Sequence, residues 1–304
     1  MILKKEEATS TICLKKKTMN SVNKNNYLII FPFIFLVLLG LVMISSASIF
    51  LAEEQTLDPF YYISRQLLFV SVGLVSMSIF LIIPSSFLLK KDWLLVLISI
   101  LLLIALFVPN VGSSVNGSIR WIRLGSIGIQ PSEICKFSLI IYISGYCFRR
   151  ASELYSFRNF LKPLTLLSVI SLLIMSQPDL GSTAIICLVV VAILFYAGIS
   201  FFQFSLLSLL IMLLGVAAIS TSPMRIARVM AFRDPFDSEI VFGSGYQLAN
   251  SLISIGQGGW TGLGLGNSFQ KNFFLPEAHT DFIFAILVEE LGVIGGIILI
   301  TAYM

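Results

Sequence analysis

The residues best suited to acid–base chemistry stand together just before the last apolar stretch of the chain. Glu277, His279 and Asp281 immediately precede a run that begins at Phe282. A carboxylate at the boundary between water and a membrane stays hydrated enough to ionise and is desolvated enough to accept a proton usefully. Asp281 is therefore a candidate general base. The alternative is an N-cap for the helix expected from Phe282, and the residues alone leave both open.

Two further carboxylates, Glu133 and Asp179, lie next to apolar runs, where a charged side chain is costly. Glu133 and Lys136 are three residues apart at the start of an apolar run, so a helix places them on one face, close enough to pair. Ionisable groups at membrane depth are costly and usually functional, so we expect this pair to hold an anionic substrate group, with a structural ion pair as the alternative. Asp179, in Gln177-Pro-Asp-Leu-Gly181, is expected to cap the following helix.

The last apolar run contains two adjacent glutamates, Glu289 and Glu290. At 1.5 Å per helical residue they lie about 12–14 Å beyond Asp281, a depth at which carboxylates need partners. The basic residues of the preceding polar segment are candidates. In that segment, Gly262-x-Gly-x-Gly266 lacks the flanking strand and spacing of a nucleotide-binding fingerprint and predicts a tightly turning loop at the membrane surface.

The composition indicates what positions these groups. Of 304 residues, 57% are hydrophobic and 12% charged, whereas soluble domains average about 45–50% apolar and about 25% charged. This excludes a soluble enzyme, a disordered chain and a collagen-like fibre, and predicts an all-α polytopic membrane protein. The formal charge of +4 is too small to indicate a nucleic-acid partner.

Apolar runs long enough for transmembrane helices predict about eight spans. We expect a basic cytoplasmic tail at 1–27, a membrane domain at 28–304 and a large outer loop at about 222–281, in which 246–255 forms an amphipathic helix. With the N-terminus inside, the short inner segments hold twelve basic residues and the short outer loops three, which places the N-terminus in the cytoplasm. The expected spans are 28–51, 66–89, 93–109, 132–148, 161–177, 182–197, 201–221 and 282–304.

Several motifs follow one another in order along the chain. They are Ser114-Val-Asn-Gly-Ser-Ile-Arg-Trp-Ile-Arg-Leu-Gly125, Gln130-Pro-Ser-Glu133-x-x-Lys136, Gln177-Pro-Asp-Leu-Gly181, Asp234-Pro-Phe236, Gly243-Ser-Gly-Tyr-Gln-Leu248 and Leu275-Pro-Glu-Ala-His-Thr-Asp-Phe-Ile-Phe284. This set resembles the SEDS family of bacterial cell-wall polymerases. The resemblance runs from about residue 30 to the end of the chain, and the division-type members are more similar than the elongation-type members.

The resemblance implies a peptidoglycan glycosyltransferase that polymerises lipid II at the outer face of the cytoplasmic membrane during septal cell-wall synthesis. It implies Asp281 as the catalytic base and Lys136 as an important lysine. We add Arg120, Arg228 and Lys271 as candidates for the diphosphate, and Glu133, Asp179 and His279 as further substrate-binding candidates. Mg²⁺ or Mn²⁺ would suit a diphosphate, yet the single histidine, His279, excludes a multi-histidine metal site and the sequence shows no dedicated ligand cluster.

The implied partners are membrane lipid, a class B penicillin-binding protein that acts as transpeptidase, and other division proteins. The family typically has ten spans, whereas this chain ends at Met304 with the eighth, so the last two are not in this sequence. Two alternatives stay open. One is a lipid II flippase, which the clustering of polar motifs on the outer side disfavours. The other is an inactive division scaffold.

Overall fold

The computed structural model describes residues 2–109, 111–115, 118–124, 127–238 and 240–304, and the side chains of these except at 2–27, 114–115, 124 and 127. The chain forms two compact units. One consists of Met1–Ser76 with Met224–Met304, and the other of Met77–Pro223. We call them the terminal unit and the central unit.

The expected helices are present, and eight of those in the described part of the chain overlap the eight predicted spans. Five of the eight are long and apolar enough to cross a bilayer, namely α2, α6, α8, α11 and residues Leu28–Thr56 of α1, and two more are shorter apolar helices, α4 and α7. The eight are α1 (Ile2–Thr56), α2 (Tyr61–Ile82), α4 (Asp92–Ala105), α5 (Pro131–Arg149), α6 (Phe157–Met175), α7 (Leu180–Tyr196), α8 (Phe201–Ser220) and α11 (Ile283–Tyr303).

The predicted second span, 66–89, is wrong in its bounds. α2 begins earlier and ends at Ile82, and a separate short helix, α3 (Ser85–Lys90), follows. The break comes from Pro84, which has no N–H to donate and disfavours helical backbone at the preceding residue. Pro84 itself is extended, with φ −66° and ψ 136°.

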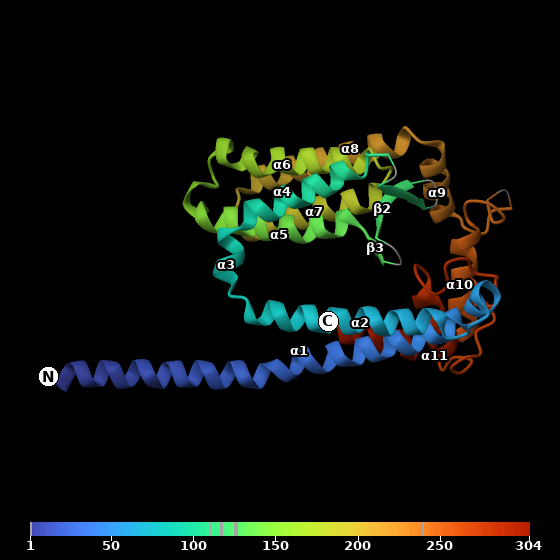
Figure 1. Cartoon of the computed structure of the whole chain (residues 1–304), viewed down its shortest axis with the longest axis horizontal. Coiled ribbons are helices and arrows are strands. Elements are labelled where there is room, and N and C mark those ends of the chain that lie inside the picture. Colours follow the sequence, from blue (N-terminus) through green and yellow to red (C-terminus); the bar gives the residue numbers. More distant parts are fainter. Residues whose placement is uncertain (1, 110, 116–117, 125–126, 239) are drawn as a thin grey trace. The chain divides into compact units, whose positions relative to one another are not determined.

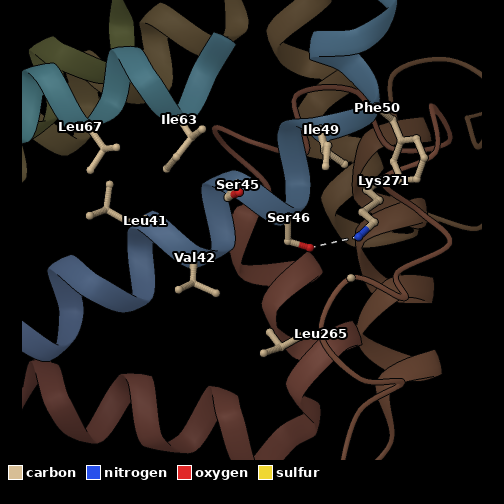
Figure 2. Close-up of a pocket in the computed structure, with 11 residues that line it drawn as sticks. Leu41, Val42, Ser45, Ser46, Ile49, Phe50, Ile63, Leu67, Leu265 and Lys271 are labelled. Atoms are coloured by element: carbon tan, nitrogen blue, oxygen red, sulfur yellow. Dashed lines mark hydrogen bonds between the residues drawn. The ribbon is translucent and has the colours of Figure 1, made fainter. Parts of the chain in front are cut away.

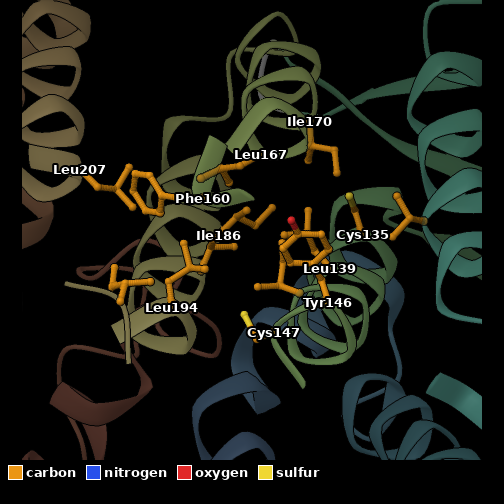
Figure 3. Packing of buried hydrophobic residues seen from close by; sticks show 14 of the residues in the cluster. Cys135, Leu139, Tyr146, Cys147, Phe160, Leu167, Ile170, Ile186, Leu194 and Leu207 are labelled. Atoms are coloured by element: carbon orange, nitrogen blue, oxygen red, sulfur yellow. The ribbon is translucent and has the colours of Figure 1, made fainter. Parts of the chain in front are cut away.

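The central unit is a helical bundle with a small sheet at one end (Figure 1). Its core lies among α4, α5, α6, α7 and α8, as shown in Figure 3. Fully buried aliphatic side chains from neighbouring helices meet there, for example Leu139 of α5, Ile170 of α6 and Leu194 of α7. The one-turn helix η1 (Ala151–Glu153) connects α5 to α6.

The sheet was not anticipated from the sequence. Strands β1 (Gly112–Val115), β2 (Ser118–Leu124) and β3 (Ile127–Ile129) pair antiparallel in the order β1-β2-β3. β2 carries the Ile-Arg-Trp-Ile-Arg part of the first family motif, a run rich in the β-branched and aromatic residues that favour strands. Asn116, Gly117 and Gly125 of that motif lie outside the described residues.

In the terminal unit, α11 packs against α10 (Tyr246–Gly258) and α1. Met43 and Ala47 of α1 join the buried face of α11 in one apolar cluster, together with Leu275 and Ala278 from the segment that precedes α11. The predicted helix at 246–255 is confirmed as α10. The expected loop also contains α9 (Pro223–Arg233), which was not predicted.

Candidate functional site

Asp281 lies just ahead of α11 with an exposed side chain. No hydrogen bond or ion pair joins its carboxylate to any residue that the structure describes. The N-cap position belongs to Phe282, which makes no side-chain cap, so the alternative interpretation of Asp281 as an N-cap is not supported. The helix starts later because the chain is still turning, with the Glu277 carbonyl accepting bonds from the amides of Thr280 and Phe282.

His279 is half-buried against α2. Its ring centroid lies 4.9 Å from that of Tyr62. Burial disfavours the imidazolium form and lowers the pKa of His279 below the ordinary 6.5, while the Glu277 carboxylate partly opposes this. His279 is therefore predominantly neutral at pH 7.

Lys271 reaches Glu290 inside the terminal unit. Its ammonium lies 2.8 Å from the Glu290 carboxylate. It also donates to the hydroxyl of Ser46 on α1 at 3.0 Å (Figure 2). The Ser46 hydroxyl also donates to Glu290 at 2.6 Å. The lysine side chain is 2% exposed and that of Glu290 is fully buried, so the two charges form a buried pair.

The neighbouring Glu289 is also fully buried, but its partners are neutral donors. One oxygen accepts from the hydroxyls of Ser254 and Ser268, each at 2.6 Å. The other accepts from the backbone amides of Phe269, at 2.7 Å, and Gln270, at 3.3 Å. A carboxylate only accepts hydrogen bonds, so these donors match its capacity.

α11 is interrupted beside these glutamates. Gly292 has φ 73° and ψ −179°. The carbonyls of Glu289 and Glu290 accept bonds from the amides of Leu263 and Gly264, and the amides of Val293 and Ile294 donate to the carbonyls of Gly259 and Trp260. The glycine-rich loop can approach this closely because Gly262 has no side chain, since a Cβ there would collide with the backbone at Glu290. The predicted tight turning is confirmed, with positive φ at Gly262, Gly264 and Gly266.

A cavity of about 630 Å³ opens beside the ion pair, between α1, α2, the end of the glycine loop at Leu265 and Gly266, and Lys271. Its wall is mostly aliphatic, and its polar lining consists of Lys271, Ser45 and Ser46 (Figure 2). The cavity suits an apolar chain with a small polar end.

The central unit brings together four of the predicted site residues as two pairs. Lys136 and Glu133 are confirmed as an ion pair, with 2.6 Å between ammonium and carboxylate. Asp179 is confirmed as the cap of α7, accepting from the Ser182 amide at 3.1 Å. Arg120 donates to the carbonyl of Pro178 at 2.6 Å, and its Nε lies 3.8 Å from the Asp179 carboxylate.

Arg228 lies exposed on α9. Asp281, His279, Lys271 and Arg228 thus belong to the terminal unit, and the two pairs above to the central unit. Among the described residues, no group of three or more His, Cys, Asp or Glu side chains is placed to hold a metal ion.

The sequence signalled that Glu289 and Glu290 need partners but did not identify Ser46, Ser254 or Ser268. Ser46 and Ser254 lie in helices, where serine is common, and Ser268 lies outside them. Nothing in the spacing of the three marks them as partners of residues far along the chain.

The fold defines a polytopic helical membrane protein. A family model described as "Cell cycle protein", covering FtsW, RodA and SpoVE, matches residues 26–304. The chain belongs to this FtsW/RodA/SpoVE family.

Curated relatives support the same assignment. A protein of Alcanivorax borkumensis is 41% identical over 273 residues, covering 89% of this chain and 70% of the relative. Proteins of Legionella pneumophila and Saccharophagus degradans are 42% and 44% identical, each over 88% of this chain and 68% and 69% of their own lengths. All three are named probable peptidoglycan glycosyltransferase FtsW.

Solved structures share the fold. A chain from a study titled "Structural coordination of polymerization and crosslinking by a peptidoglycan synthase complex" matches with a TM-score of 0.67 at 22% identity, over 90% of this chain and 74% of the other. The rod shape determining protein RodA of Thermus thermophilus matches with a TM-score of 0.60 at 22% identity, over 91% of this chain and 71% of RodA.

Proposed function

We propose that this protein is a peptidoglycan glycosyltransferase that polymerises lipid II at the outer face of the cytoplasmic membrane. The family and the names of the curated relatives support the enzyme class. The observation that carries the reaction is Asp281, an exposed carboxylate with no partner among the described residues, on a segment anchored by the buried side chains of Leu275 and Ala278.

In the proposed reaction, Asp281 takes the proton of the acceptor sugar's 4-hydroxyl. The resulting oxygen nucleophile attacks the anomeric carbon of the donor sugar, and the bond from that carbon to the diphosphate oxygen breaks. The electron pair leaves with the lipid diphosphate, and the proton stays on Asp281 until solvent removes it. A positioned base of this kind contributes about 10²–10⁴-fold to a rate.

Positive charge stabilises a diphosphate leaving group. Lys136 and Arg120 are the better suited of the candidates, because their side chains are 22% and 34% exposed and can meet a ligand. Arg228 is also exposed. Lys271 is enclosed with Glu290, so a direct contact with diphosphate would require that pair to open.

We place the N-terminus in the cytoplasm and the enzyme at the division septum, working with a class B penicillin-binding protein. The charge count supports the orientation. The likeness of the fold to a chain studied in a complex for polymerisation and crosslinking supports a transpeptidase partner.

The test is glycan synthesis from labelled lipid II by the full chain with its cognate transpeptidase in lipid nanodiscs. Asp281→Asn keeps the size of the side chain and removes the base, so we expect the rate to fall by about 10²–10⁴-fold. Glu54→Gln, an exposed change of the same kind near the end of α1 in the same unit, is the matched control and should retain the rate. Normal glycan ladders from Asp281→Asn would overturn the proposed base, and lipid II scrambling without ladders by the wild type would favour a flippase.

A further inference from the structure

The Glu289 carboxylate connects α11 to two other parts of the terminal unit. The Ser254 hydroxyl ties it to α10, and three donors tie it to residues 268–270. The adjacent Glu290 holds Lys271. The segment 268–271 is therefore held on α11 by both glutamates, at a point that the chain reaches shortly before Asp281.

The same segment is connected to Asp281 through a short series of contacts. The amide of Leu275 donates to the carbonyl of Gln270 at 2.9 Å. Leu275 and Ala278 are 3% and 6% exposed and pack into the apolar cluster with α1 and α11. The amides on either side of Asp281 both donate to the carbonyl of Glu277. The backbone that carries Asp281 is thus fixed from both directions.

Both ends of the segment 271–281 are held at the same helix, α11. Asp281 stands at the start of α11, and Glu289 lies about 12 Å further along it at 1.5 Å per residue. The chain from 271 to 281 leaves the helix at the glutamates and returns at its N-terminal end, and fixing both ends of a loop reduces the conformations open to it. A base that must meet a substrate proton works at a distance set within tenths of an ångström, so this restriction acts on rate.

We infer that Glu289 is a positioning residue for Asp281, acting through Ser268 and the segment 268–271. The inference rests on the proposed role of Asp281 as the base. It goes beyond that role because it assigns a purpose to a buried carboxylate that has no cationic partner among the described residues and does not reach solvent.

Two serines provide a matched test. Ser268 and Ser254 are both buried, and both donate at 2.6 Å to the same oxygen of Glu289, but only Ser268 belongs to the segment that leads to Asp281. We expect Ser268→Ala to lower kcat for lipid II polymerisation by about 10-fold, with KM unchanged within about 2-fold, as for a displaced catalytic group. Ser254→Ala should keep kcat within about 2-fold of the wild type, although each variant lowers the thermal unfolding midpoint. Glu289→Gln should keep most of the wild-type kcat. Its amide oxygen can still accept from the two backbone amides, and its NH₂ can donate to both hydroxyls.

A double variant separates this inference from the proposed base. In an Asp281→Asn background, Ser268→Ala should cause no further loss, because residues that act as a unit are not additive. Equal kcat for Ser268→Ala and Ser254→Ala would overturn the inference and leave Glu289 a purely structural role. A further loss of kcat when Ser268→Ala is added to Asp281→Asn would also overturn the inference. If Asp281→Asn alone retained the wild-type rate, the proposed base itself would fail, whatever the serine variants showed.

Discussion

The buried pair between Lys271 and Glu290 yields the sharpest prediction for stability. Two unit charges 2.8 Å apart attract by about 6 kcal/mol at an effective dielectric constant of about 20. The cost of removing both from water offsets much of this, but that cost remains for Glu290 when only the lysine is removed. We therefore expect Lys271→Met to lower the free energy of unfolding by about 3–5 kcal/mol, the range for breaking one side of a buried ion pair.

The structure supplies a control with the same chemistry and different burial. Lys136 and Glu133 are 2.6 Å apart, but the carboxylate is 58% exposed. Lys136→Met should therefore cost only about 0.2–1 kcal/mol, as for exposed pairs. The double variant Lys271→Met with Glu290→Gln should recover most of the loss, because no charge is left buried and the glutamine can still bond to Ser46.

Denaturation of the purified variants in mixed micelles, followed by circular dichroism, measures these differences. Equal losses for Lys271→Met and Lys136→Met would refute the reasoning from burial, and so would a double variant no more stable than Lys271→Met alone. Glycan synthesis by the double variant adds a second result. Recovered stability with recovered synthesis assigns Lys271 a structural role, whereas recovered stability without synthesis supports its contact with the diphosphate.

Two further predictions concern backbone and pH. Gly292→Ala should destabilise the fold, because φ is 73° there and a Cβ would collide with the carbonyl of Trp260, whereas Gly40→Ala in α1, with open space around it, should be neutral or slightly stabilising. Comparable unfolding midpoints for the two variants would contradict the close packing at the break. The pKa of His279 is lowered in the folded protein from 6.5, so the unfolded chain binds more protons below that pH. The contribution of His279 to stability should be constant well above pH 6.5 and fall as the pH drops below it. His279→Gln should remove this contribution from the slope of unfolding midpoints measured from pH 8 to about pH 5. A slope unchanged in His279→Gln would assign the pH dependence to other groups.

Local signals in the sequence predicted several features of the site correctly. The i,i+3 spacing of Glu133 and Lys136 predicted their pairing, because helix geometry alone places such residues together. Asp179 ahead of an apolar run predicted its cap for the same kind of reason. The glycine spacing at 262–266 predicted a tight turn, since glycine adopts positive φ at little cost.

Other features were missed because hydropathy and spacing do not register a proline break, a local turn or a short sheet. Pro84 ended the second predicted span early, a local effect that hydropathy does not register. The N-cap that the residues left open as an alternative for Asp281 does not form, because the turn at Glu277 delays the start of α11. The strands beside residues 116–117 were missed because a short three-stranded sheet has no long periodic pattern.

Hydropathy, helical spacing and ordered motifs predicted a polytopic membrane protein, the approximate positions of its eight long apolar helices and its family, because these signals are properties of neighbouring residues. The partners of the buried charges could not be predicted in this way. Glu290 pairs with Lys271 and Ser46, and Glu289 binds donors from α10 and from 268–270. A buried carboxylate must be satisfied wherever the fold brings donors to it, and that depends on how α1, α10 and the glycine loop pack around the break in α11.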